Sequence, residues 1–278
     1  MDIVWKVGDI LIKIYSEIDE ISDLISMCAV DNQEAEIGKG QRYSIYILQN
    51  KVTSSVSLMC VCHQNGDLVY RDNLPLCYCG TVLFNQVLPK IVIRERGYLL
   101  FHASGIVAND RLILFLGKSG SGKTSLVLKA VLSYGASYFS DDFTVYNIRT
   151  RKFIPFPRML HIKPDTERRF MLNGKGKIEF EKQSKDGYAT KYKVFYPKEI
   201  EGMKCVCTSS AEYKELAFVD ACYLGNINSA IPERIETAAA SSRFEMLAEN
   251  CANIKTAQTD LIAGYRQVKD CAKMIMFF

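Results

Sequence analysis

The sequence predicts an α/β protein with two parts, a β-rich segment over residues 1–96 and a core of alternating strands and helices over 97–278. Short runs rich in Ile, Val and Tyr, separated by turn residues, fill the first 80 positions and are typical of strands. From residue 98 onward, apolar runs alternate with a segment of helical periodicity. The 278 residues, of which 48% are hydrophobic, suffice for one large domain or two small ones.

The N-terminal segment is expected to contain five strands and two helices. The expected strands are 9–15, 42–49, 55–62, 67–71 and 75–79. A short helix is expected at 19–28, because Ile21, Leu24 and Ile25 share one helical face. A second helix is expected at 81–96, with an apolar stripe and a kink or break at Pro89.

The ten cysteines include three C-x-C pairs, at 60/62, 77/79 and 205/207. In a strand this spacing places both thiols on one face. Paired cysteines of structural zinc sites usually have two to four residues between them, whereas these pairs have one. We therefore expect free thiols in the core, with a zinc site or disulfides as the alternatives.

The core begins with an expected hairpin. Residues 98–108 and 111–117 form the two strands, and Asn109-Asp110 forms a tight turn between them. With that turn, the numbers of cross-strand partners sum to 219, which places His102 opposite Gly117. Ser104 then shares the face of His102, unless Gly105 makes a bulge.

Residues 117–124 read GKSGSGKT and fit the phosphate-loop pattern G-x-x-x-x-G-K-[ST], with an apolar run before and a helical pattern after. The glycines let successive backbone N–H groups surround a phosphate at the start of a helix. Lys123 is expected to reach the β- and γ-phosphates, and the Thr124 hydroxyl to bind Mg²⁺. The expected nucleotide-binding residues are Gly117, Lys118, Ser119, Gly120, Ser121, Gly122, Lys123, Thr124 and Ser125.

The phosphate-loop helix should run over 124–134 and end at Gly135, and residues 137–148 should form the next strand. A right-handed crossover makes this strand parallel to 111–117, so Asp141 and Asp142 lie at the edge where α/β folds bind ligands. Paired acids suit phosphoryl transfer to an alcohol, since one can hold Mg²⁺ and the other can accept the hydroxyl proton. The alternative is a purely structural turn cap.

The rest of the chain is predicted from composition and periodicity. The polar stretch 165–204 is expected to be a mobile hairpin or lid over the site, with a passive surface insertion as the alternative. Beyond it we expect a strand at 215–224, helices at 232–249 and 256–268, and a closing strand at 271–278.

Three segments, His102-Ala103-Ser104-Gly105, GKSGSGKTSL and Ser140-Asp141-Asp142, resemble the C-terminal domain of bacterial HPr kinase/phosphorylase. They are still more similar to its relatives among peptide-tailoring kinases, including lasso-peptide kinases that phosphorylate a serine of a precursor peptide. The resemblance implies a phosphate-loop kinase core with a mixed β-sheet, related to ATP-dependent phosphoenolpyruvate carboxykinase. It implies Asp142 as general base, Asp141 as its metal-side or water-positioning neighbour, and His102 near the transferred phosphate.

The implied activity is Mg²⁺- and ATP-dependent transfer of the γ-phosphate to a serine or threonine hydroxyl of a precursor peptide or small protein. Arg158, His161 and Lys163 are candidates for phosphate or substrate contact, and Glu179 and Glu199 for a further Mg²⁺ ligand. The glycine-rich segment that the HPr enzyme uses for dephosphorylation has no match here, so we expect a kinase without the reverse activity. The N-terminal segment does not resemble that of the HPr enzyme.

Two alternatives stay open, a small-molecule or carboxykinase-like enzyme of the same fold and a nucleotide-gated binding module with little turnover. A net charge of +4 with 24% charged residues gives no electrostatic footprint for nucleic acid. No signal peptide and no apolar stretch of membrane-spanning length is expected. The sequence therefore predicts a cytoplasmic protein without a membrane partner, and it is compatible with a homo-oligomer.

Overall fold

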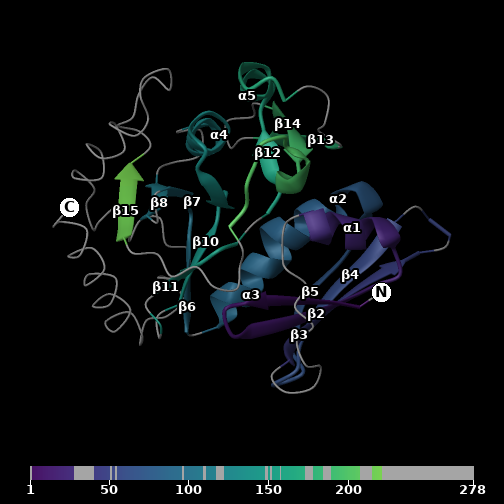
Figure 1. Ribbon diagram of the computed structural model, residues 1–278. Helices are drawn as coiled ribbons and strands as arrows, with labels where there is room; N and C mark the ends of the chain where they lie inside the picture. The colour runs from purple at the N-terminus through teal and green to yellow at the C-terminus, as the bar shows by residue number, and fades with distance from the viewer. Residues whose placement is uncertain are drawn as a thin grey trace.

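A computed structural model describes 2–27, 41–50, 52–53, 55–95, 97–108, 111–116, 122–147, 150, 152–156, 158–172, 178–183, 189–206 and 215–220. The architecture is mixed α/β (Figure 1), which confirms the coarse fold prediction. A five-stranded sheet with its helices lies on one side of the molecule, and smaller sheets with α4 (Lys123–Tyr134) and α5 (Pro164–Arg169) occupy the other. These elements alone do not establish a phosphate-loop kinase core, because residues 117–121 lie outside the described part.

The N-terminal segment is β-rich, as predicted. Its sheet has the order β1 (Asp2–Val7), β2 (Ile10–Ser16), β3 (Gln41–Gln49), β4 (Ser55–Cys62), β5 (Leu68–Pro75). Strands β2 and β3 are parallel and the other pairs antiparallel, so the sheet is mixed. Strand β1 was not expected, although its alternating residues Ile3, Trp5 and Val7 are buried. Helix α1 (Asp19–Met27) forms where predicted, with Ile21 and Ile25 buried.

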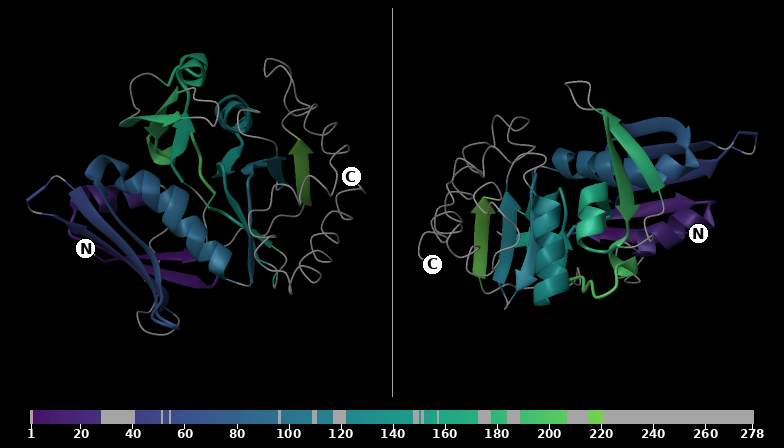
Figure 2. Two further views of the ribbon diagram at one scale, coloured as in Figure 1. Left: turned by 180° about the vertical axis from the view of Figure 1, so that it is seen from behind. Right: turned by 90° about the horizontal axis from the view of Figure 1, so that it is seen from above.

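One long helical run lies against this sheet, as both views in Figure 2 show. It consists of α2 (Leu76–Val82), a π turn η1 (Leu83–Val87) and α3 (Leu88–Arg94). The predicted strand 75–79 is therefore wrong. Burial follows the helical spacing Cys79, Leu83, Val87, Ile91, so packing of one helical face overrides the local strand propensity.

Pro89 does not end this helix. Proline lacks the N–H that would bond to the carbonyl four residues back, and its ring clashes with that carbonyl. The residue four positions back is Asn85, which lies inside the π turn. The wider turn therefore accommodates Pro89 within a continuous helix.

Among the described residues, the 19-residue run Leu76–Arg94 is long and apolar enough to cross a membrane by length and composition, with a mean hydropathy of 1.4 over an 18-residue window. The expectation that no apolar stretch approaches this length is therefore corrected. Half of the run is buried inside the protein, which accounts for its apolar face as a core helix. The expectation that the protein has no membrane partner stays a prediction.

Trp5, the single tryptophan, joins this sheet to the helical run and to the core. Its ring centre lies 5.1 Å from that of Phe84 and 5.9 Å from that of Phe156, on which it stacks, and its side chain is 1% exposed.

We expect Trp5→Ala to lower the free energy of unfolding by about 3–5 kcal/mol, and Trp5→Phe by less. Urea titration followed by circular dichroism measures both, and equal, small losses would contradict this packing role.

The C-x-C pairs differ in their surroundings. Cys60 and Cys62 are buried on the same face of β4, as predicted, whereas Cys77 and Cys79 lie on α2, with Cys77 exposed and Cys79 buried. The expectation that both thiols of a pair lie on one face of a strand therefore does not hold for Cys77 and Cys79. Cys205 is a half-buried free thiol, and the described cysteines are all free.

Burial raises the pKa of the Cys60 and Cys79 thiols to about 12. Since the thiolate is the nucleophile, we expect iodoacetamide at pH 8 to label Cys77 and to spare Cys60 and Cys79 until the protein unfolds. Mass spectrometry of tryptic peptides measures this pattern. Labelling of Cys79 as fast as Cys77 would be incompatible with the buried face of α2.

In the core, each of two expected long strands is broken into two short ones. Residues 98–108 form β6 (Tyr98–Phe101) and β7 (Ser104–Ala108), and residues 137–148 form β9 (Ser137–Ser140) and β10 (Thr144–Asn147). Strands β6 and β10 pair in one sheet with β11 (Lys152–Ile154), and β7 and β9 pair in another. The prediction of two continuous strands is therefore wrong.

The predicted hairpin register is confirmed for the described residues. Strand β8 (Arg111–Leu116) pairs with β7 from Ala108↔Arg111 to Ser104↔Phe115, and the numbers of each pair sum to 219. The register of β7 against β9 shifts at Gly105, where a bulge was considered. His102 lies outside β7, and Gly117 outside the described residues, so their expected pairing is not tested.

Helix α4 (Lys123–Tyr134) follows β8 and ends at Gly135 with a φ of 71°, as predicted. Strands β8 and β9 each run antiparallel to β7, which lies between them, and are therefore parallel to each other. Strand β15 (Glu215–Asp220) pairs in parallel with β8 and confirms the strand expected there. The elements expected at 232–249, 256–268 and 271–278 lie outside the described residues.

The predicted lid segment, 165–204, contains a hairpin of β13 (Ile178–Gln183) and β14 (Ala189–Phe195). Strand β12 (Leu160–Ile162) pairs with β14, and α5 (Pro164–Arg169) connects β12 to the hairpin segment. The 3₁₀ turn η2 (Pro197–Glu199) follows. Figure 1 shows this unit beside α4 and above the N-terminal helices; its mobility stays a prediction.

Candidate active site

Two neighbouring strand breaks create the centre of the site. The β6–β10 ladder ends at the pair Phe101↔Thr144, and the β7–β9 ladder begins at Gly105↔Ser140. The chain between these ladders therefore leaves regular pairing twice, at residues 102–103 and 141–143. His102, Asp141 and Asp142 lie in these two breaks, where the backbone is free to present side chains to a ligand.

The breaks are held together by side-chain hydrogen bonds. The Ser104 hydroxyl donates to Asp141 Oδ1 at 2.5 Å, and the Asp142 amide donates to Ser104 Oγ at 3.3 Å. The Thr144 hydroxyl donates to the Ala103 carbonyl at 3.1 Å. Ser104 was expected only to share a face with His102, and here it positions both acids.

The N-terminus of α4 meets these acids. Gly122 precedes the helix with a φ of 92°, a conformation that glycine adopts without a steric cost. Thr124 donates its hydroxyl to both Asp141 oxygens, at 3.0 and 3.1 Å. The hydroxyl and the carboxylate predicted to hold Mg²⁺ are thus adjacent, although their positions are 17 residues apart in the chain.

Asp141 is 1% exposed, so its charge is poorly solvated. Burial raises its pKa to about 6, the neighbouring Asp142 adds to this rise, and hydrogen bonds from Ser104 and Thr124 oppose it. A divalent cation beside the carboxylate would favour its ionised form. The donor set of one carboxylate and one hydroxyl is the hard-oxygen chemistry that Mg²⁺ prefers.

Asp142 differs from its neighbour in backbone and in environment. Its φ is 61°, a left-handed conformation just beyond the end of β9 at Ser140, and its side chain points toward the cavity. Its side chain is 35% exposed, and Oδ2 lies 3.5 Å from Arg158 Nη2. Burial alone would raise the pKa of Asp142, but Arg158, His161, His102 and Lys123 together lower it below its ordinary value. The carboxylate is therefore ionised at neutral pH.

Arg158 is 1% exposed and lies beneath Asp142. Its Nη2 also lies 3.3 Å from His161 Nδ1, and its guanidinium lies 5.1 Å from the centre of the Phe143 ring. Its Nε and Nη1 have no hydrogen-bond partner among the described residues. A buried cation with unused donors favours an anionic ligand nearby.

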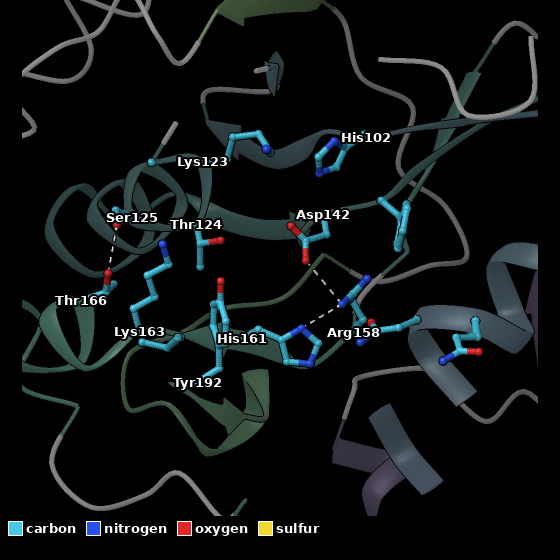
Figure 3. Close-up of a pocket in the computed structure, with 15 residues that line it drawn as sticks. His102, Lys123, Thr124, Ser125, Asp142, Arg158, His161, Lys163, Thr166 and Tyr192 are labelled. Carbon is cyan, nitrogen blue, oxygen red and sulfur yellow. Dashed lines mark hydrogen bonds and ion pairs between the residues drawn. The ribbon is translucent and has the colours of Figure 1, made fainter. Parts of the chain in front are cut away.

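A cavity of about 530 Å³ connects these groups (Figure 3). Lys123 and His102 lie at one side, Arg158 and His161 at the other, and Asp142 between them. Asp142 is the only carboxylate among the described lining residues, which also include three permanent cations. The cavity is therefore electropositive, as a polyphosphate site requires. The described lining residues are Asn85, Gln86, His102, Gly122, Lys123, Thr124, Ser125, Asp142, Phe143, Arg158, His161, Ile162, Lys163, Thr166 and Tyr192.

Most of the predicted site residues that can be placed meet at this cavity. Asp141 borders it through Thr124, and Lys163 lines it with its Nζ 5.9 Å from the Tyr192 ring centre. Glu199 is not among the described lining residues, and the Glu179 side chain is outside the described part. The described part of the chain also leaves out five residues of the predicted phosphate loop, Gly117, Lys118, Ser119, Gly120 and Ser121.

Several lining residues were not expected from the sequence. Thr166 on α5 and Tyr192 on β14 come from the predicted lid, and Thr166 Oγ1 lies 3.4 Å from Ser125 Oγ. Asn85 and Gln86 come from the π turn of the N-terminal segment. Their signal in the sequence is an adjacent pair of carboxamides inside an otherwise apolar helical run.

Comparison of the sequence with family models and with curated proteins gave no match in either case.

Proposed function

We propose that this protein is a kinase of the HPr kinase-like class that transfers the γ-phosphate of ATP, with Mg²⁺, to a serine or threonine hydroxyl of a peptide or small protein. The observation that carries the proposal is the division of labour between the paired acids. Asp141 bonds to the phosphate-loop Thr124, whereas Asp142 faces the cavity beside Arg158. One acid on the metal side and one on the acceptor side is what transfer to an alcohol needs.

The residues divide the reaction between them. Thr124 and Asp141 would hold Mg²⁺, which when bound neutralises charge on the phosphate oxygens. Lys123 attracts the β- and γ-phosphates. The acceptor oxygen forms a bond to the γ-phosphorus while the bond from that phosphorus to the β–γ bridging oxygen breaks, and ADP leaves. Asp142 accepts the acceptor's hydroxyl proton, and Arg158 offers positive charge opposite Lys123.

A small-molecule acceptor is the second candidate, because a cavity of about 530 Å³ lies within the usual range for small ligands. The peptide acceptor is favoured by the position of the cavity. It extends from α4 past β14 of the lid segment to the helical run of the N-terminal segment, so elements from three separate regions of the chain border it. A peptide needs such additional surface to offset its ordering entropy.

The test is incubation of the protein with Mg²⁺, ATP and two acceptor sets, one of end-blocked serine peptides and one of free hydroxyl metabolites. We expect a mass increase of a single phosphoryl group on peptides, with stoichiometric ADP. Transfer only to free metabolites would favour the second candidate. ATP binding without transfer to either set would favour a nucleotide-gated binding module.

A further inference from the structure

The π turn carries two polar side chains to a place where an apolar helix would have none. In the run from α2 to α3, Leu83, Phe84 and Val87 are buried in the core around Trp5. Asn85 and Gln86 between them line the cavity instead. A π turn widens the helix and changes the direction of the residues within it, and such turns occur frequently at functional sites.

Asn85 has unused hydrogen-bonding capacity. Its Oδ1 is buried and has no hydrogen-bond partner among the described residues. Because a buried acceptor without a donor carries a desolvation cost, a core helix would gain stability from an apolar residue here. The χ2 angle of asparagine is broad, so a small rotation can present the carboxamide to the cavity.

Gln86 has a different environment. Its side chain is exposed, and its Oε1 lies 3.4 Å from the Tyr70 hydroxyl, whose single proton it shares with Asp72 Oδ2 at 3.2 Å. Tyr70 comes from β5, so the N-terminal sheet contacts this carboxamide. Asn85 and Gln86 together offer N–H donors and C=O acceptors, which is the complement of a peptide main chain.

The charges of the lining residues indicate which ligand group these carboxamides suit. Gly122, Lys123 and Thr124 define the nucleotide end of the cavity, and Asp142 with Arg158 defines the point of transfer. Asn85 and Gln86 come from a separate part of the chain and lack the positive charge that binds phosphate. The group they suit is therefore the acceptor.

We propose that Asn85 and Gln86 form an acceptor subsite, in which their carboxamides hydrogen-bond the main chain of the acceptor peptide next to the hydroxyl that receives the phosphate. This inference rests on the proposed kinase function. It assigns recognition of the acceptor to the N-terminal segment, and it makes that recognition partly independent of the acceptor's side chains.

The test uses two probe pools of end-blocked hexapeptides with one central serine and degenerate flanks. In the second pool the peptide nitrogens on both sides of the serine are methylated, which removes the N–H groups that Asn85 Oδ1 would accept from. We expect the wild-type protein to phosphorylate the unmethylated pool with about tenfold higher kcat/KM. Asn85→Leu should lose this discrimination, because it cannot accept a hydrogen bond, while KM for ATP stays unchanged.

Asn85→Leu should also keep or raise the melting temperature, since it removes a buried unpaired acceptor. Gln86→Ala, at an exposed position, is the second variant and should raise KM for the unmethylated pool about three- to tenfold. Gln64→Ala, on the exposed turn after β4, is its matched control and should leave KM unchanged. Thus a folding defect of the first variant would not prevent the test.

Three results would overturn the subsite. They are equal use of both pools by the wild-type protein, undiminished discrimination in Asn85→Leu, and unchanged KM in Gln86→Ala. In each of these the peptides are still phosphorylated, so the kinase proposal survives. A wild-type protein that binds Mg²⁺ and ATP but phosphorylates neither pool would overturn both proposals together.

Discussion

Replacement of Asp142 by asparagine is expected to lower kcat for phosphoryl transfer by about 10²- to 10⁴-fold, because the carboxamide cannot accept the acceptor proton. Asparagine suits this position sterically, since it tolerates the left-handed backbone at φ 61° at least as well as aspartate. Affinity for Mg²⁺ and ATP should therefore survive. Steady-state kinetics and calorimetry of the same preparation measure both quantities.

Asp19→Asn, on the exposed first turn of α1, is the matched control and should leave kcat unchanged. An equal loss of Mg²⁺–ATP affinity in Asp142→Asn would make Asp142 a metal ligand. Asp141, whose pKa is raised to about 6 by burial, would then be the better candidate for the base. A kcat within threefold of the wild type would rule out proton transfer to Asp142 as a significant contribution.

Replacement of Lys123 by alanine is expected to weaken binding of Mg²⁺ and ATP by about 100-fold, since it removes the charge that meets the β- and γ-phosphates. Lys123 is 5% exposed and lines the cavity, so its ammonium group is poorly screened by solvent. Calorimetric titration with ATP in the presence of Mg²⁺ measures this loss. Lys123→Met, which keeps most of the packing volume, should give the same result.

The same helix supplies the control. Lys129 lies on α4 with its Nζ 6.0 Å from the centre of the Tyr134 ring, away from the cavity. Lys129→Ala should leave nucleotide affinity unchanged, although it removes the same formal charge. Similar losses in both variants would indicate a nonspecific effect of net charge and would contradict a phosphate site at the N-terminus of α4.

Regular elements with a strong local pattern were predicted well. The β7–β8 register followed from a two-residue turn, and α4 ended at Gly135, because a turn and a helix end depend on residues close in the chain. The helical run Leu76–Arg94 was only partly predicted. Its first turn contains residues with strand propensity, and only burial against the five-stranded sheet decides their conformation.

The residues of the candidate site likewise fall into those that the sequence predicted and those that it did not. The motif around Lys123 and the acids Asp141 and Asp142 were visible in the sequence because their spacing is itself the signal. No comparable spacing in the sequence marks the other lining residues Asn85, Gln86, Thr166 and Tyr192. They reach the cavity from a π turn, a short helix and a hairpin that pack around it.

By itself, the sequence determined the α/β class, the β-rich N-terminal segment and the order of the chemical groups along the chain. Only the tertiary structure decided that two strands break side by side, so that Ser104 bonds to Asp141, 37 residues away, and Arg158 lies beneath Asp142. The physical reason is the separation along the chain of the residues that interact. Turn geometry and helix ends depend on neighbours in the chain, whereas burial and charge pairing depend on residues brought together by packing.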